Sequence, residues 1–454
     1  MVKQIRTRLC VVFSAVILSG CSSLSQHSYS TVGGSPWQGN SQEVWDSLQQ
    51  TSSAQLSRQA AGANDPIKAG WIQLALISKR DSRNTNQLVN DILAWRAQYP
   101  SHPGNSLLPD NATLTSLLTQ TKPAQVAILL PERGTLSSAG LAVRTGIMNS
   151  YYASGIKQNV KFYDTTSGTS MNDLYQQAIT DGANAVIGPL VKADVQSLAS
   201  NGNFSVQTLA LNYTSPTFGS LPTNFYEFGL LPEDDVAQMA ARARREGGSH
   251  AIVIAPQNAY GQRMMAAFSN QWQANGGSIQ DTYIYTSQMD FNAGIAHLLK
   301  VDPDADKRLS QSGANRNTLS QQRRQDFDVI ILFGNSQDAH VIVPLLRYYY
   351  ANNVPIFASS SVVSGNAASD MDLNGVTVCD IPFSMQANRS ADGSLPSDKL
   401  TAVGQDAYTI SQNLPRMQAL PHFPLYGATG ALYLSSDHQI HRRIPCTTIQ
   451  NGAL

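Results

Sequence analysis

The stretch QVAILLPERGTLSSAGLAVRTGIMNSYY, residues 125–152, decides the fold of this 454-residue chain. It opens with an uninterrupted apolar run at 126–130, which is typical of a strand buried on both faces of a parallel sheet. Pro131 and Gly134 end the strand in a short loop, and apolar side chains then recur at helical spacing. The stretch therefore predicts a strand–loop–helix unit. In open α/β sheets, loops of this kind form the binding crevice.

The same unit recurs through the remainder of the chain. Further strands are expected at 160–163, 185–187, 206–211, 225–230, 251–255, 282–285, 329–333 and 355–358, with helices between most of them. Strands that alternate with helices in this way predict two doubly wound α/β lobes around a hinge. We expect this domain to cover 121–454. The first lobe would comprise about 124–230 and 384–423, and the second about 231–383 and 424–454.

The N-terminus has the layout of a secretory signal, predicted to cover 1–20. Basic residues precede a short apolar run that is too short for a membrane helix. The following Leu-Ser-Gly-Cys21 resembles the lipobox of bacterial lipoproteins, in which the cysteine is lipidated and becomes the new N-terminus. Several acyl chains anchor a protein stably, whereas one chain binds marginally. Ser22 stands where Asp would retain the protein at the inner membrane, so the resemblance implies the periplasmic face of the outer membrane.

A tether and a short helical segment separate the anchor from the α/β domain. Residues 21–40 are rich in Ser and Gly and lack periodicity, which indicates a flexible tether. Residues 41–120 predict an all-α segment with three helices at about 41–60, 65–80 and 85–99. The spacing around Trp71 is similar to that of a tetratricopeptide hairpin. Such repeats usually need about three units to stand alone, so we expect the segment to pack on the next domain. It would be either a partner-binding or spacer element, or a structural collar.

Two of the four cysteines remain after processing and lipidation. Cys379 and Cys446 are 67 positions apart, and a secreted protein is exposed to an oxidising compartment. A disulfide between them would contribute about 4 kcal/mol in the chain-entropy model. The alternative is a pair of buried free thiols.

Composition and motifs argue against nucleic-acid binding and catalysis. Basic and acidic residues number 31 each, with no basic stripe. The sequence lacks the hydrolase, metalloprotease, redox and nucleotide-binding motifs. Ser154 and Lys157 match S-x-x-K, but no K-T-G or S-D-N accompanies them, so we interpret the match as coincidence. His438 and His441 are equally unconvincing as a metal site. We therefore predict no enzyme activity, cofactor or metal.

Polar residues just after the predicted strands are the candidates for a ligand cleft. They are Glu132, Arg133, Asp164, Asn212, Gln257, Asn258, Tyr260 and Asn335. Arg133 and Asp164 could bind the carboxylate and the amine of an amino-acid-like ligand. The alternative is a vestigial cleft with ordinary loop residues. The polar stretch 301–327 is either a functional loop or a solvated insertion.

An ordered set of short motifs resembles one family over about residues 90–454. The stretches include WRAQYPSHP at 95–103, VIGPL at 186–190, DLNGV at 372–376, DAY at 406–408 and GATG at 427–430. With the lipobox, they are similar to the outer-membrane lipoproteins of the LpoA family, which activate penicillin-binding proteins. The helical segment is shorter here than in enterobacterial members.

This resemblance implies a two-lobed domain of the type I periplasmic-binding-protein kind without enzymatic activity. It also implies binding to a class A penicillin-binding protein and stimulation of peptidoglycan synthesis. The alternative hypothesis is a lipid-anchored solute-binding protein for a small polar, amino-acid-like ligand.

Overall fold

The computed structural model describes residues 37, 39–80, 84–215, 218–302, 323–387 and 399–454. The predicted signal peptide, Cys21, nearly all of the tether and most of the 301–327 insertion lie outside the described residues. Within the described part of the chain, no helix is both long and apolar enough to cross a membrane.

The helical segment is built from helices whose starts are encoded by capping residues. Its elements are α1 (Ser41–Gln50), α2 (Ser53–Ala60), α3 (Pro66–Lys79), α4 (Thr85–Gln98), the 3-10 helix η1 (Pro103–Leu107) and α5 (Asn111–Leu118). Asp65 caps α3 directly before Pro66. The single helix expected at 41–60 is wrong, because Ser52 and Gln55 form a capping box that starts a second helix.

Lobe 1 contains a five-stranded parallel sheet in the order β2-β1-β3-β4-β5. Its strands are β1 (Gln125–Leu130), β2 (Asn159–Asp164), β3 (Ala185–Ile187), β4 (Gln207–Ala210) and β5 (Phe225–Glu227). The helices around it are α6 (Ser137–Ser154), α7 (Met171–Thr180), α8 (Lys192–Ala199), α16 (Lys399–Ser411) and α17 (Leu414–Ala419). The short 3-10 helix η2 (Gly134–Leu136) precedes α6. Strand β1 is buried over nearly its whole length, as its apolar run predicts.

Helices α6 and α16 cross closely although about 250 residues separate them in sequence. A Cβ atom at Gly146 would lie 1.9 Å from the carbonyl oxygen of Thr401. A Cβ atom at Gly404 would lie 2.1 Å from the carbonyl oxygen of Val143. Only glycine therefore permits this crossing, which fixes the returning chain against lobe 1.

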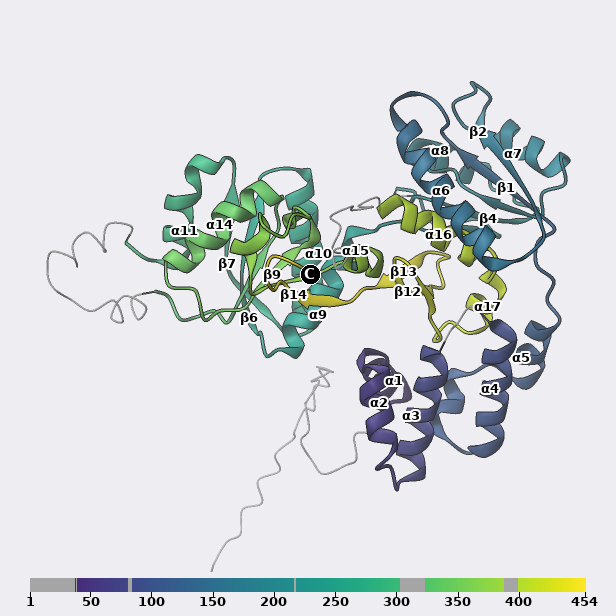
Figure 1. Ribbon diagram of the computed structural model, residues 1–454, viewed down its shortest axis with the longest axis horizontal. Coiled ribbons are helices and arrows are strands. Elements are labelled where there is room, and N and C mark those ends of the chain that lie inside the picture. The colour runs from purple at the N-terminus through teal and green to yellow at the C-terminus, as the bar shows by residue number, and fades with distance from the viewer. Residues whose placement is uncertain (1–36, 38, 81–83, 216–217, 303–322, 388–398) are drawn as a thin grey trace, which may run out of the picture.

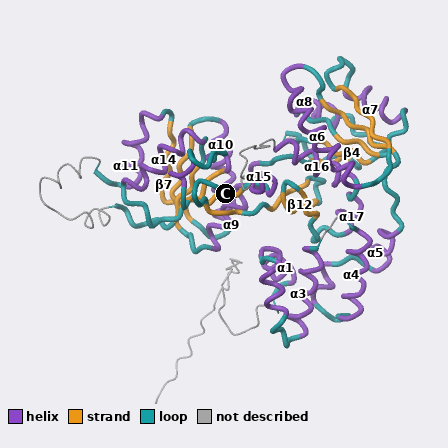
Figure 2. Tube along the Cα trace, in the orientation of Figure 1, coloured by secondary structure: helices purple, strands orange, loops and turns teal. Residues whose placement is uncertain are grey.

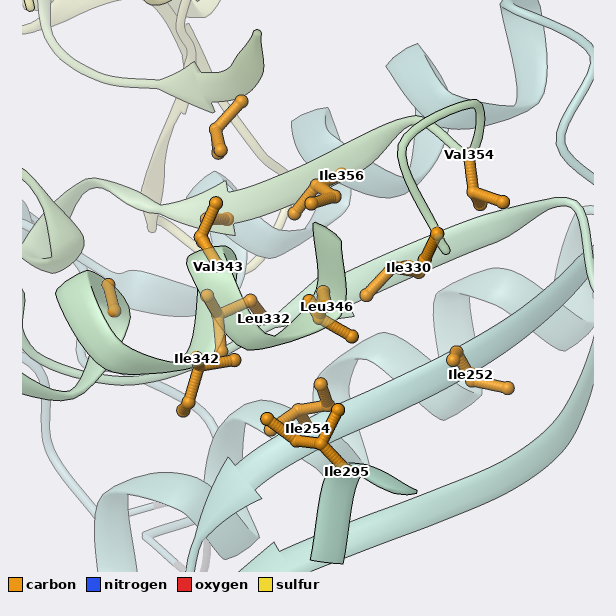
Figure 3. Close-up of a cluster of buried hydrophobic side chains, with 14 of the residues drawn as sticks. Ile252, Ile254, Ile295, Ile330, Leu332, Ile342, Val343, Leu346, Val354 and Ile356 are labelled. Carbon is orange, nitrogen blue, oxygen red and sulfur yellow. The ribbon is translucent and has the colours of Figure 1, made fainter. Parts of the chain in front are cut away.

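Lobe 2 contains a six-stranded sheet in the order β14-β10-β9-β8-β6-β7. Its strands are β6 (His250–Pro256), β7 (Ser278–Tyr285), β8 (Val329–Leu332), β9 (Ile356–Ser359), β10 (Val376–Cys379) and β14 (Cys446–Thr448). The helices of this part are α9 (Pro232–Arg245), α10 (Ala259–Ala274), α11 (Phe291–Leu299), α14 (Ser336–Tyr348) and α15 (Pro382–Ala387), with the 3-10 helices η3 (Gln288–Asp290), η4 (Ser360–Val362) and η5 (Asp370–Leu373). Side chains of β6, β8 and β9 pack against α11 and α14 in its core (Figure 3).

A small antiparallel sheet joins the two lobes. It consists of β11 (Leu425–Gly427), β12 (Gly430–Leu434) and β13 (Ile440–Arg443). Leu425, Leu432 and Ile440 pack in the core of lobe 1. This differs from our assignment of the whole of 424–454 to lobe 2, because β14 alone pairs with the second sheet. The ribbon β12–β13 lies between the lobes, and the helical segment lies beside lobe 1 (Figures 1 and 2).

The last strand is attached to lobe 2 by a covalent link. Strands β10 and β14 are antiparallel neighbours in which Cys379 lies opposite Cys446. Of the two alternatives left open by the sequence, the structure has the disulfide between these residues.

Candidate functional site

The predicted candidates of lobe 1 lie together at the ends of β1 and β2. The backbone amides of Glu132 and Thr166 donate to Oδ1 of Asp164 over 3.1 and 2.8 Å. Arg133 Nε lies 3.3 Å from Asp164 Oδ2, and Arg144 pairs with Glu132. Hydrogen bonds from Thr166 and the neighbouring backbone lower the pKa of Asp164. The acid that we expected to bind a ligand amine thus stabilises its own loop.

Asn212 has a comparable local role at the end of β4. Its Nδ2 donates to the carbonyl oxygen of Leu190 over 3.1 Å, and its Oδ1 accepts from the amide of Tyr213 over 3.0 Å. The Nδ2 bond therefore connects the loops that follow β3 and β4, whereas the Oδ1 bond stays within the second loop.

The candidates of lobe 2 serve mainly as helix caps. Asn258 accepts from the amide of Gly261 at the start of α10, and Asn335 accepts from the amide of Asp338 at the start of α14. Gln257 is exposed. The hydroxyl of Tyr260 lies 3.4 Å from that of Ser361. These contacts explain why polar residues follow the strands without invoking a ligand.

The two groups of candidates do not form one site. In the part of the chain that the structure describes, no hydrogen bond or ion pair joins a lobe 1 candidate to a lobe 2 candidate. Tyr260 lines a small cavity of about 170 Å³ whose other walls also come from lobe 2 and its α9 connection. The geometry does not provide the converging donors and acid that an amino-acid clamp requires.

The junction between the lobes instead holds a charged cluster around the buried side chain of Arg442. The guanidinium of Arg442 is fully buried and donates to Asp235 over 2.8 Å and to the carbonyl oxygen of Leu231 over 3.2 Å. Asp234 accepts from the Arg442 amide and lies 3.0 Å from Nδ1 of His441. Burial raises the pKa of Asp235 to about 6, although Arg442 opposes the shift. The hydrogen bond to Asp234 raises the pKa of His441. The cluster links β13 to the N-terminus of α9.

The helical segment shares a hydrophobic core with lobe 1. The rings of Trp45 and Phe423 have centroids 5.0 Å apart, and Trp45 Nε1 donates to the carbonyl oxygen of His422 over 2.9 Å. Leu420 and Phe423 are buried in the same cluster as Trp71. The segment therefore packs on the following domain, as its shortness predicts.

Polar contacts extend the helical segment to the lobe junction. Asp46 in α1 pairs with Arg443 of β13 over 3.0 Å. Arg245 in α9 donates to Oε1 of Gln50 over 2.8 Å. Because α9 belongs to lobe 2, α1 contacts residues on both sides of the junction.

Several of the motifs that resemble the LpoA family form hydrogen bonds between separate elements of the fold. The buried carboxylate of Asp406 accepts from the amides of Ala428 and Thr429 and from the Thr429 hydroxyl, so the DAY and GATG motifs meet. Burial raises the pKa of Asp406 to about 6 against these hydrogen bonds. Trp95 Nε1 donates to the carbonyl oxygen of Gly70 over 2.8 Å. These motifs hold elements distant in sequence together.

The residues considered for chemistry serve separate structural purposes. The hydroxyl of Ser154 donates to the carbonyl oxygen of Tyr151. The ring of His438 packs 4.9 Å from that of Tyr226, whereas His441 contacts Asp234. Among the described residues, no group of three or more His, Cys, Asp or Glu side chains could hold a metal ion.

Sequence reasoning missed the residues that join the parts of the molecule. The acidic run at 233–235 is favourable for the dipole of α9, but nothing in the sequence identifies Arg442 as the partner of Asp235, 207 positions away. No sequence feature indicated that Phe423 packs against the helical segment either. Trp45 on the apolar face of α1 was the available signal that this helix packs against another part of the chain. That signal does not identify Phe423 as the residue it contacts.

The comparisons with known proteins agree with this architecture. The family model described as "LppC putative lipoprotein" matches residues 27–452. The chain belongs to the LppC family. A relative from Photobacterium profundum, named "Penicillin-binding protein activator LpoA", is 27% identical over 423 residues, which are 89% of this chain and 68% of the relative.

Solved structures show where the similarity of this LppC-family chain lies. A monoclinic form of Haemophilus influenzae LpoA has a TM-score of 0.62 and 24% identity, and the match covers 90% of this chain and 72% of that one. The C-domain of the same protein, described as "a regulator of PBP1A", has a TM-score of 0.57 and 23% identity. That match covers 72% of this chain and 98% of that domain. The predicted fold, a two-lobed domain preceded by helices, is confirmed.

Proposed function

We propose that this protein is a non-enzymatic lipoprotein that binds and stimulates a class A penicillin-binding protein and so regulates peptidoglycan synthesis. The observation that carries the proposal is the family match over 27–452, which spans both the helical segment and the α/β domain. A relative similar over 89% of the chain is named an activator of a penicillin-binding protein. A solved C-domain with the same fold is described as a regulator of PBP1A.

The geometry supports a role in protein contact rather than ligand capture. Asp164, Asn258 and Asn335 use their side chains within their own lobes. The helical segment is instead packed onto lobe 1 through Trp45 and Phe423. A preformed assembly of this kind offers a partner a fixed surface and avoids the cost of ordering it on binding. The solute-binding alternative lacks comparable support.

We propose outer-membrane anchoring through lipidated Cys21, with the folded part in the periplasm. The membership of a lipoprotein family and the lipobox-like sequence support this placement. Labelling of cells with a radioactive fatty acid tests it, because wild type should be labelled and Cys21→Ser should not. Recovery of the labelled protein in the inner-membrane fraction would contradict the proposed address.

The activity is tested by adding the mature chain, made with Cys21→Ser so that it carries no lipid, to the cognate class A penicillin-binding protein. Glycan polymerisation and peptide cross-linking from lipid II are followed at increasing concentrations. We expect faster synthesis that saturates near stoichiometric binding. The protein without the synthase should leave lipid II unchanged. Absence of both binding and a rate change would overturn the proposed function.

A further inference from the structure

A cavity of about 580 Å³ lies between the helical segment and lobe 1. The start of α4 and the end of α5 form one side, and the ends of α6 and α16 form the other. Its volume lies in the range of small-molecule sites, which is about 300–1,000 Å³. The cavity is separate from the loops at the carboxyl ends of the strands, where this fold usually binds ligands.

The floor of the cavity contains a buried amide with an unused acceptor. Gln412 is only 6% exposed, and its Oε1 has no hydrogen-bond partner among the described residues. Buried polar atoms are nearly always paired, so such an atom requires an explanation. The adjacent Asn413 is fully engaged, since its Oδ1 accepts from the hydroxyl of Thr85 and its Nδ2 donates to the carbonyl oxygen of Thr409. The Gln412 oxygen is shielded from solvent, so it would accept from a ligand after its side chain turns into the cavity.

The charge of the cavity is positive. Lys122 lies at its rim and Arg416 at its floor, and no Asp or Glu is among its described lining residues. The ammonium of Lys122 donates to the carbonyl oxygen of Gln412, and partial burial together with the charge of Arg416 lowers its pKa. Helix α4 begins at Thr85, so its positive end adds to the field. The chemistry favours an anion that also carries hydrogen-bond donors.

We propose that this cavity binds a small carboxylate-bearing ligand that has hydroxyl or amide donors. The carboxylate would lie near Lys122, and a donor would reach the Gln412 oxygen once that side chain turns into the cavity. Exposed Asn86 and Gln120 at the rim supply further amide groups. A sugar acid and a peptide C-terminus share this chemistry. Because the walls come from two parts of the chain, the ligand stabilises the contact of the helical segment with lobe 1. The inference does not depend on the proposed synthase.

The experiment uses the mature chain and three probes in calorimetric titration and thermal unfolding. N-acetylmuramic acid presents a carboxylate on a sugar, and D-alanyl-D-alanine presents one on a peptide. N-acetylglucosamine is the matched sugar without the lactyl carboxylate. We expect at least one acid to bind and to raise the melting temperature, since a ligand of the native state stabilises it by mass action. The acid that binds with the lower Kd shows whether the cavity prefers a carboxylate on a sugar or one on a peptide.

Matched charge variants locate the binding. Lys122→Gln removes the cation at the rim and should weaken binding of the acid roughly ten-fold, the scale of a charge-assisted hydrogen bond. Lys192→Gln removes an exposed cation of α8 outside the cavity and should leave binding unchanged. Gln412→Glu, with folding checked by circular dichroism, should abolish binding through repulsion. Binding by neither acid, equal binding of the neutral sugar, or equal effects of the two lysine variants would overturn the proposal.

Discussion

The contact of the helical segment with lobe 1 differs sharply from the edges of the two sheets. At the contact, aromatic side chains from Trp45 and Phe423 share one buried cluster and a hydrogen bond crosses to His422. At the sheet edges, the hydrogen bonds that the structure shows for Asp164 and Asn335 stay within single lobes. The first region therefore joins two parts of the molecule, whereas the contacts of the second stay within one part.

This difference between the helical contact and the sheet edges leads us to expect that the helical segment and lobe 1 stay together as one unit. At the contact of the helical segment with lobe 1, apolar burial and a hydrogen bond act together. Separating the segment from the lobe would expose the large aromatic side chains of Trp45 and Phe423 to water. At the second region, Asp164, Asn258 and Asn335 make their hydrogen bonds within their own lobes, so we expect little gain in stability from lobe closure. The predictions that follow test this contrast, from the largest expected effect to the smallest.

Trp45→Ala should have the largest effect. The side chain is 1% exposed, and removing a buried Trp usually costs about 3–5 kcal/mol. Chemical unfolding measures the loss, and limited proteolysis should show cleavage within the helical segment. Tyr152→Ala is the control, because that side chain is 73% exposed and surface changes are usually within about 0.5 kcal/mol. Equal effects of the two changes would show that the junction is not a shared core.

Loss of the disulfide should be the next largest effect. Replacing both Cys379 and Cys446 by Ala should lower the free energy of unfolding by about 4 kcal/mol, because the bridge closes a long loop of the unfolded chain. Denaturant titration measures the change. Wild type should show no titratable thiol from these residues after denaturation, and two reactive thiols would contradict the bridge.

The charged lobe junction predicts a pH dependence with a definite sign. The pKa of Asp235 is about 6 in the folded protein, above its ordinary value of 3.8. Its contribution to stability is therefore fully present below about pH 4 and is lost as the pH rises through about 6. The stability of wild type relative to Asp235→Asn should fall over this interval. Unfolding at several pH values measures both proteins, and parallel curves would contradict the shifted pKa.

Asn335→Ala should have a small effect on stability and none on activation. The loss of an N-cap costs about 1 kcal/mol, and Asn335 caps α14. Asn270→Ala, on the exposed part of α10, is the control for a simple surface change. Thermal unfolding and the lipid II assay are run on both. A variant that folds normally but loses stimulation would place function at the sheet edge.

The sequence predicts the local elements because their signals are local. The apolar run at 126–130 forms the expected strand, and the helix expected at about 65–80 spans Pro66–Lys79 with Asp65 as its cap. The break between α1 and α2 was also encoded, in the spacing of Ser52 and Gln55, but was overlooked.

The arrangement of these elements in space could not be predicted from local signals, because it depends on contacts between residues far apart in the sequence. Whether the C-terminal strands joined lobe 1 or lobe 2 depends on the packing of Leu432 and Ile440 against residues far away in sequence. The candidates do follow their strands, but sequence alone does not distinguish an Asn that caps a helix from an Asn that binds a ligand, so both alternatives stayed open. The cavity floored by Gln412 combines segments about 300 positions apart, and no single stretch indicates it.

The most direct test of the contrast measures distances between spin labels on the three parts of the mature chain. Labels on exposed cysteines introduced at Ser57, Lys192 and Asn270 report on the helical segment, lobe 1 and lobe 2. The account predicts a single narrow distance between the first two, and a lobe-to-lobe distance that a panel of amino acids does not change. A broad first distribution, or a lobe-to-lobe distance shortened by an amino acid, would contradict it.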